Sequence, residues 1–333
     1  MRLYIVASPF QFFLACNDAF AFDEKSIIFV IRYKNDDIDY LSLSSRLFSR
    51  QFYVVVVDYP RLGPRAFSEI ALYAILFLKI FFKVFWPNNI CIGDHCNTPS
   101  LLVGSIFGRI AYVLGDGASI VWGHPDIQLS PIKSILFKIL NIEIEKIQNT
   151  VDVKTFTRDW PLVASLYKNL PVKNEIWIFG STAPMTSLEM GHGTNEKVRK
   201  GLIGWTPETK DSYWSILARF TSSFNDTLIK YFPHRNECIP ENIPNKFAIV
   251  SESCPAEFRP ILFGYLPTVI IGSSTIIFSF SNIRRILKRD IEIYFFSFSE
   301  RIDMEYKRFG ACPIPSMYNL VENIVDQTGI AIG

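Results

Sequence analysis

Short apolar runs alternate with longer segments of helical pattern along the first half of the chain. The runs are rich in β-branched residues and end at turn residues, which is typical of strands buried on both faces of a parallel sheet. They lie at residues 3–7, 26–32, 52–57, 89–93 and 109–114. Helical patterns occupy 10–22, 36–48, 66–86, 99–107 and 132–140. This order predicts a parallel α/β sheet with right-handed crossovers.

A second alternating set follows an irregular, charged stretch at 142–171. Its predicted strands are 175–179, 228–232, 247–250, 268–271 and 291–296, and its predicted helices are 212–224, 256–265, one starting at 274, and 317–326. The polar, glycine-containing segment 187–206 is predicted as a loop. We therefore expect an N-terminal domain at 1–155, a linker at 156–171 and a C-terminal domain at 172–333, with the two α/β domains facing across a cleft.

The helical segment 66–86 is unusually long and aromatic. A helix that spans a membrane needs about 20 apolar residues, and Glu69, Lys79 and Lys83 interrupt this one. The first interpretation is a buried crossover helix. The second is an interfacial helix that contacts a membrane surface, and a true span is the third.

Composition narrows the class of protein. With 333 residues and 49% hydrophobic content, the chain can bury a sizeable core. The 34 basic and 32 acidic residues give no support to nucleic-acid binding. The six cysteines form no disulfide framework. Cys91 and Cys96 flank His95, and these three residues are only a weak candidate for a metal site. The N-terminus is too short and too polar for a signal peptide, so a cytoplasmic protein is expected, with peripheral contact on the inner membrane left open.

The most informative polar segment is Pro233-His234-Arg235, which follows the predicted strand 228–232. An imidazole and a guanidinium at the carboxyl end of a strand lie where open α/β sheets bind ligands. His234 can donate a hydrogen bond to an anion or a proton to a leaving group. The alternative is a solvated loop histidine.

Two further strand ends carry polar residues. Gly115-Asp116-Gly117 allows a sharp turn that leaves the carboxylate available as a general base, although an ordinary Asp-Gly turn has the same pattern. Ser273 and Ser274 follow Gly272 just before a predicted helix. Hydroxyls and backbone amides at a helix N-terminus can hold a phosphate, whereas simple helix capping needs only one of them.

Glu257 occupies the first turn of the predicted helix 256–265. Its carboxylate can pair with sugar hydroxyls, as acidic residues do with riboses. The alternative is an acidic residue favoured by the helix dipole. No Gly-x-Gly-x-x-Gly follows the first strand, so a standard dinucleotide site is not expected.

Together these motifs resemble those of bacterial sialyltransferases of the lipooligosaccharide and polysialyltransferase type. The chain is in this respect similar to glycosyltransferase family 52. Those enzymes carry an acidic-acidic-Gly, a His-Pro and a Ser-Ser/Thr motif in that order, which here read 115–117, 233–235 and 273–274. The segments 7–11, 178–181 and 255–257 are also similar. Glycine replaces the first acidic residue, and Arg235 stands where a proline is expected. A literal His124-Pro125 lies in the first half, so His234 is preferred.

The resemblance implies a GT-B fold and an inverting, metal-independent transfer of sialic acid from CMP-sialic acid, with no separate cofactor. Asp116 would take the proton from an acceptor hydroxyl, and protonated His234 would neutralise the departing phosphate. The acceptor would be a glycan or lipid-linked glycan of the bacterial surface, such as lipopolysaccharide, lipooligosaccharide or capsule, commonly through galactose. The implied donor-binding residues are Gly180, Ser181, Pro233, Arg235, Glu257, Ser273 and Ser274.

Three other functions fit the same sequence. One is a transferase for another CMP-activated nonulosonic or Kdo-type sugar, and the second is a GT-B transferase that uses a UDP- or GDP-sugar. The third is a non-catalytic, membrane-associated scaffold built around the segment 66–86. The oligomeric state is left open.

Overall fold

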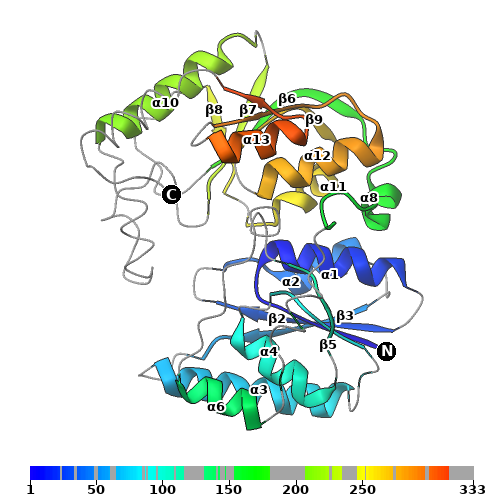
Figure 1. Ribbon diagram of the computed structural model, residues 1–333. Helices are drawn as coiled ribbons and strands as arrows, with labels where there is room; N and C mark the ends of the chain where they lie inside the picture. Colours follow the sequence, from blue (N-terminus) through cyan, green and yellow to red (C-terminus); the bar gives the residue numbers. More distant parts are fainter. Residues whose placement is uncertain are drawn as a thin grey trace. The chain divides into compact units, whose positions relative to one another are not determined.

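A computed structural model describes most of the chain. The described residues are 1–22, 25–33, 36–48, 52–60, 65–84, 87, 89–94, 97–108, 110–115, 131–139, 142, 147, 154–180, 207–224, 227–234, 246–251, 253–272, 275–296 and 300–314. Internal contacts divide the chain into two compact units. Unit 1 comprises Met1–Lys168 and Ser253–Arg259, and unit 2 comprises Asn169–Glu252 and Pro260–Gly333. Each unit contains its own parallel sheet (Figure 1).

Unit 1 is built on a five-stranded parallel sheet in the order β3-β2-β1-β4-β5. The strands are β1 (Arg2–Val6), β2 (Ser26–Arg32), β3 (Phe52–Asp58), β4 (Asn89–Ile92) and β5 (Ile110–Val113). The helices are α1 (Pro9–Ala21), α2 (Tyr40–Leu47), α3 (Arg65–Val84), α4 (Thr98–Phe107), α6 (Pro131–Ile139) and α8 (Pro161–Leu166). All five predicted strands are confirmed. Helix α8 was missed, because the sequence around it was interpreted as a linker.

Both faces of this sheet are covered by helices, which explains why its strands are apolar almost throughout. On one face, Leu3 and Ile5 of β1 belong to a core cluster that includes residues of α3, α4 and α6. On the other face, the Tyr4 hydroxyl donates to Asp18 Oδ2 of α1 at 2.7 Å. Figure 1 shows α1 and α3 on opposite sides of the strands.

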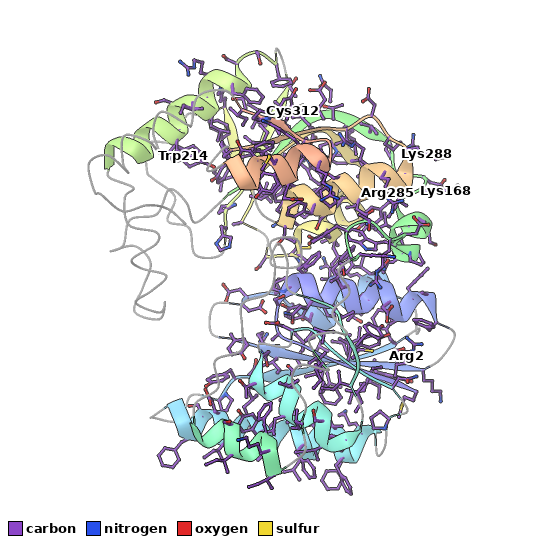
Figure 2. The ribbon with its side chains drawn as sticks, in the orientation of Figure 1. Arg2, Lys168, Trp214, Arg285, Lys288 and Cys312 are labelled. Carbon is purple, nitrogen blue, oxygen red and sulfur yellow. The ribbon has the colours of Figure 1, made fainter. Side chains whose placement is uncertain are left out.

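A buried polar cluster fastens α1 to the amino end of β1. Tyr4 and Tyr112 both donate to the Asp18 carboxylate, and Arg2 Nη1 lies 3.7 Å from Asp18 Oδ2. The Arg2 guanidinium carbon also lies 3.2 Å from the centroid of the Phe22 ring (Figure 2 labels Arg2). Burial, followed by the negative charge of Asp18, raises the pKa of Tyr4 far above its ordinary value, so Tyr4 stays a hydrogen-bond donor.

Unit 2 is built on a six-stranded parallel sheet in the order β11-β10-β9-β6-β7-β8. The strands are β6 (Val172–Phe179), β7 (Leu228–Phe232), β8 (Phe247–Ile249), β9 (Leu266–Gly272), β10 (Glu292–Phe295) and β11 (Cys312–Pro313). The helices are α10 (Pro207–Thr221), α11 (Arg259–Phe263), α12 (Thr275–Leu287) and α13 (Glu300–Arg308). The sequence did not predict α13 or β11. The predicted helix 317–326 and the predicted loop 187–206 lie outside the described residues.

Alternate residues of β6 pack against helices on opposite faces of this sheet. Ile176 and Ile178 belong to a core cluster with Leu217 of α10. Trp177 lies 5.3 Å from the ring of Phe263 in α11, and Phe179 lies 5.5 Å from Phe280 in α12, as measured between ring centroids. The central strand is therefore buried on both sides, as expected for a doubly wound sheet.

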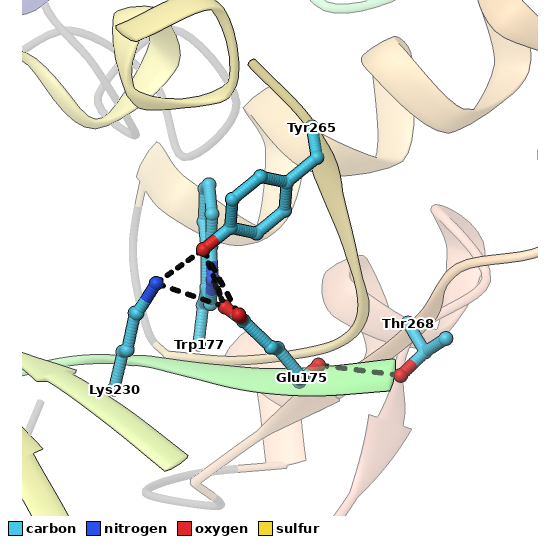
Figure 3. Close-up of polar contacts among 5 residues, drawn as sticks. All are labelled: Glu175, Trp177, Lys230, Tyr265 and Thr268. Atoms are coloured by element: carbon cyan, nitrogen blue, oxygen red, sulfur yellow. Dashed lines mark hydrogen bonds and ion pairs between the residues drawn. The ribbon is translucent and has the colours of Figure 1, made fainter. Parts of the chain in front are cut away.

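An ion-paired cluster joins β6, β7 and β9 near the amino ends of these strands (Figure 3). Glu175 Oε2 lies 3.1 Å from Lys230 Nζ and accepts from Trp177 Nε1 at 3.1 Å and from the Tyr265 hydroxyl at 2.8 Å. Lys230 also donates to that hydroxyl. Burial alone raises the pKa of Glu175, but the hydrogen bonds from Trp177, Tyr265 and Lys230, together with the charge of Lys230, lower it below its ordinary value.

Replacing Glu175 with glutamine should destabilise unit 2 by about 2–3 kcal/mol at neutral pH, because Lys230 loses its half-buried counter-charge. The lowered pKa means that the ionised Glu175 stabilises the fold above about pH 4.5. This stabilisation is lost as the pH falls through the folded-state pKa. The difference in unfolding free energy between wild type and Glu175→Gln should therefore shrink from pH 6 to pH 3, as urea titrations can measure.

The exposed Arg32–Asp58 pair, with a distance of 2.6 Å between Nε and Oδ1, supplies the control. Asp58→Asn should change stability by less than about 1 kcal/mol, because an exposed ion pair contributes little. An equal gap between wild type and Glu175→Gln at both pH values would contradict the role given to the ionised carboxylate.

Helix α3 connects β3 to β4 and buries one face in unit 1, where Leu72, Leu76 and Ile80 are fully inaccessible to solvent. This agrees with the interpretation of a crossover helix. Among the described residues, no helix is long and apolar enough to cross a membrane.

Candidate functional site

The strand order of unit 2 reverses at one position in its sheet, between β6 and β9. Strand β6 pairs with β7 on one side and with β9 on the other. The chain builds β6-β7-β8 outward in one direction and then β9-β10-β11 in the other, so the order reverses between β6 and β9. In open α/β sheets, ligands bind outside the carboxyl ends of the strands at this switch point.

The carboxyl ends of β6 and β7 are held side by side. Phe179 and Phe232 are register partners, and the Gly180 amide donates to the Phe232 carbonyl at 2.8 Å. Gly180 therefore continues the pairing one residue beyond β6 and lies at the edge where the sequence predicted a nucleotide contact. Ser181 lies outside the described residues.

His234 lies two residues beyond the end of β7, next to β6. Pro233 and His234 are both half-buried, and Arg235 lies outside the described residues. The prediction that a strand ending before Pro233 carries His234 to the carboxyl edge of the sheet is confirmed. A half-buried imidazole at this edge is accessible to solvent.

The end of β9 forms the other side of the switch point. A Cβ atom added at Gly272 would lie 3.2 Å from Ile276 Cγ2, so the first turn of α12 packs closely against the end of β9 here. Helix α12 begins at Thr275, three positions after Gly272. Ser273 and Ser274 lie between β9 and α12 in the sequence but outside the described residues.

Glu257 is found in unit 1 rather than in the C-terminal domain, where the sequence analysis put it. It lies in the short 3₁₀ helix η2 (Ala256–Phe258), is only 3% exposed, and its backbone carbonyl accepts from the Tyr167 hydroxyl. The neighbouring Phe258 ring packs against Phe13 of α1 at 5.3 Å between centroids. Burial of this ring explains why the segment joins unit 1. A contact between Glu257 and a ribose stays a prediction.

The first residue of the predicted Gly-Asp-Gly turn is described at the carboxyl end of β5. Gly115 has a φ of +91°, a conformation that side chains other than glycine rarely adopt. The preceding Leu114 amide donates to the Ile92 carbonyl at 2.9 Å, which fixes the start of the turn to the sheet. Asp116 and the alternative His124 lie outside the described residues.

The sequence analysis missed a close contact at the switch point of unit 1, between β1 and β4. The buried Gln11 side chain accepts from the Ala7 amide at 2.8 Å, and a Cβ atom at Gly93 would lie only 2.0 Å from Gln11 Oε1. Ser8 caps α1 by accepting from the Gln11 amide at 3.3 Å. The segment 7–11 therefore forms a fixed turn. The sequence feature that could have indicated this contact is Gly93, which directly follows the strand 89–92.

The described residues contain no group of three or more histidine, cysteine, aspartate or glutamate side chains that could hold a metal ion. His95 and Cys96, which formed the weak metal set with Cys91, lie outside these residues.

Comparison with known proteins identifies relatives by fold alone. No protein-family model matches the chain, and no curated protein matches its sequence. The structure is similar to UDP-GlcNAc 2-epimerase from Neisseria meningitidis bound to UDP-GlcNAc, with a TM-score of 0.50 and 10% identity over 98% of this chain and 91% of that chain.

Two weaker matches also span nearly the whole chain. UDP-GlcNAc 2-epimerase from Methanocaldococcus jannaschii in complex with UDP-GlcNAc and UDP has a TM-score of 0.48 and 13% identity, covering 98% of this chain and 93% of that chain. The E. coli heptosyltransferase WaaC with ADP has a TM-score of 0.40 and 10% identity, covering 99% and 98%. With two parallel-sheet α/β domains and a full-length match to the Neisseria enzyme, the chain has the GT-B fold.

Proposed function

We propose that this protein is a glycosyltransferase that moves sialic acid from CMP-sialic acid to a hydroxyl of a bacterial surface glycan. The observation that carries the proposal is the position of His234, two residues beyond β7 and beside the switch point of β6 and β9. In a doubly wound sheet, a nucleotide phosphate would bind at this edge. A proton donor here would therefore lie beside the phosphate. The motifs on either side resemble those of bacterial sialyltransferases in order and in chemistry.

In this proposal the reaction inverts the anomeric centre in a single displacement. Asp116 removes the proton from the acceptor hydroxyl, the acceptor oxygen attacks the anomeric carbon, and the bond from that carbon to the CMP phosphate breaks. Protonated His234 neutralises the charge that grows on the departing phosphate. The transition state is cationic at the sugar and anionic at the leaving group, so preorganised donors at the phosphate contribute most.

The remaining candidate residues would hold the donor. Ser273 and Ser274 precede the N-terminus of α12, where backbone amides and hydroxyls can bind the phosphate. The backbone of Gly180 and Ser181 would approach the nucleotide. Pro233 and Arg235 flank His234, and Arg235 would add a positive charge. Glu257 would hold the ribose. The acceptor would be a glycan or lipid-linked glycan, with galactose as the favoured sugar.

CMP should raise the melting temperature of the protein more than UMP or GMP at equal concentration. A ligand that binds only the native state adds about 2.7 kcal/mol of stability at a concentration 100 times its Kd. The Ser273→Ala/Ser274→Ala variant should lose most of the CMP effect while its own melting temperature without nucleotide stays close to that of the wild type. Differential scanning fluorimetry measures all of these values.

A larger shift with UMP or GMP would assign the donor to another nucleotide and overturn the CMP-sugar proposal. Absence of any nucleotide effect would favour a non-catalytic scaffold. Given a CMP effect, release of CMP from a panel of CMP-activated sugars separates sialic acid from other nonulosonic or Kdo-type donors.

A further inference from the structure

Helix α3 presents an apolar face to solvent in addition to its buried face. Residues of an α-helix advance by about 100° each, so Phe67, Ile70 and Leu78 lie on the side opposite the buried Leu72 and Leu76. These three side chains are all exposed, Phe67 by 62%. The exposed residues on this side of α3 are, in chain order, Phe67, Ile70, Ala74, Phe77, Leu78, Phe81 and Phe82. This outward face of α3 therefore contains no charged residue.

Helix α6 exposes further apolar residues. Its Phe137 side chain is buried in the same core cluster as Leu76 and Ile80 of α3, so the two helices belong to one layer of unit 1 (Figure 1). Ile135 and Ile139 of α6 are exposed, Ile139 by 74%. We call the exposed apolar residues of α3 and α6 the α3–α6 face. Exposed apolar residues gathered on two helices of one layer mark a candidate site of contact with a protein or a membrane.

The charged side chains of α3 and α6 that the structure describes are mostly positive. They are Lys79, Lys83 and Lys138, with one half-buried carboxylate, Glu69. Lys83, in the last turn of α3, and Lys138, in the last turn of α6, are both exposed. An aromatic and aliphatic surface with an exposed lysine in the last turn of each helix matches the interfacial region of an anionic bilayer, where apolar side chains enter the headgroup boundary and lysines meet anionic lipids.

We propose that the α3–α6 face docks unit 1 on the surface of an anionic phospholipid bilayer. A second copy of the chain is a poorer occupant. A twofold interface brings the same patch of both subunits together, which would bring Lys83 and Lys138 of both copies into one interface. The proposal does not depend on the reaction that the protein catalyses. It gives a physical role to the long aromatic helix that the site leaves unused.

Vesicle sedimentation with the full chain tests this docking. The protein should bind vesicles of phosphatidylglycerol and phosphatidylcholine, and bind pure phosphatidylcholine vesicles much more weakly. Phe67→Ser/Phe82→Ser should weaken binding to the anionic vesicles by roughly a hundredfold, on the order of tenfold for each phenylalanine. The matched control Tyr53→Ser/Met304→Ser removes two side chains that are equally exposed but lie outside the α3–α6 face. This control should bind within about twofold of the wild type.

A second variant, Lys83→Gln/Lys138→Gln, leaves the apolar residues in place and should weaken anionic binding by about fivefold for each lysine. Melting temperatures of all variants should match that of the wild type, since every replaced side chain is exposed. Unchanged vesicle binding by both α3–α6 variants would overturn the proposal, as would equal binding to neutral vesicles. A dimer that dissociates in Phe67→Ser/Phe82→Ser, without any vesicle binding, would assign the face to a second copy instead.

Discussion

Replacing His234 with alanine should lower sugar transfer by about 10²–10⁴-fold and leave the protein folded, because a positioned acid contributes about that much to a rate. His234 is half-buried and lies two residues beyond the last residue of β7, so its replacement should leave the sheet of unit 2 intact. The loss should fall mainly on kcat, because the charge that His234 neutralises exists chiefly in the transition state. Single-turnover transfer from CMP-sialic acid, with the melting temperature as a folding check, measures both expectations.

The chain supplies its own control for this experiment. His124 is followed by a proline, as the catalytic histidine of the resembled family is, but it lies in the first half of the chain. His124→Ala should retain transfer within a few-fold of the wild type. The reverse result, with activity lost in His124→Ala and kept in His234→Ala, would transfer the catalytic role to His124. The pH profile adds a second readout, since His234→Ala should lose the fall in kcat/KM at alkaline pH that follows deprotonation of the acid.

The strands were predictable from sequence because parallel strands buried on both faces leave a simple pattern. Phe52 to Val57 is almost entirely apolar and β-branched, and it forms β3 (Phe52–Asp58) one residue longer than expected. His234 could be placed for a related reason. Pro233 cannot donate to the ladder, so the strand ends before it, and the next residue must leave the sheet at its carboxyl edge.

The features that were missed depend on contacts between residues far apart in the chain. Locally, Glu257 ahead of an apolar run indicates a helix of the second domain, yet the Phe258 ring is buried against α1 and the segment belongs to unit 1. The contact between Gln11 and Gly93 joins two turns 82 positions apart, since 93 − 11 = 82. Helix α8 has only six residues, too few to show helical periodicity. Its Leu162 amide donates to Asn17 Oδ1 of α1 at 3.2 Å, a contact between residues 145 positions apart.

Replacing Asp116 with asparagine should also reduce transfer by about 10²–10⁴-fold, since the amide keeps the shape of the side chain but cannot accept the proton of the acceptor. Gly115, with its φ of +91°, follows β5 and directly precedes Asp116 in the sequence. The thermal shift with CMP should be unchanged, because the base acts on the acceptor and not on the donor. Asp94→Asn alters a carboxylate that follows β4 of the same sheet and should retain nearly full transfer.

The double variant Asp116→Asn/His234→Ala decides whether the two residues serve one reaction. In a single displacement, proton removal and phosphate departure share one transition state, and residues that act as a unit lose far less together than the product of their separate losses. Transfer by the double variant should therefore be close to that of the weaker single variant. Losses that multiply would show that the two side chains contribute independently to the transition state and not as a unit. Near-normal transfer by the single variant Asp116→Asn would show that Asp116 is not the base.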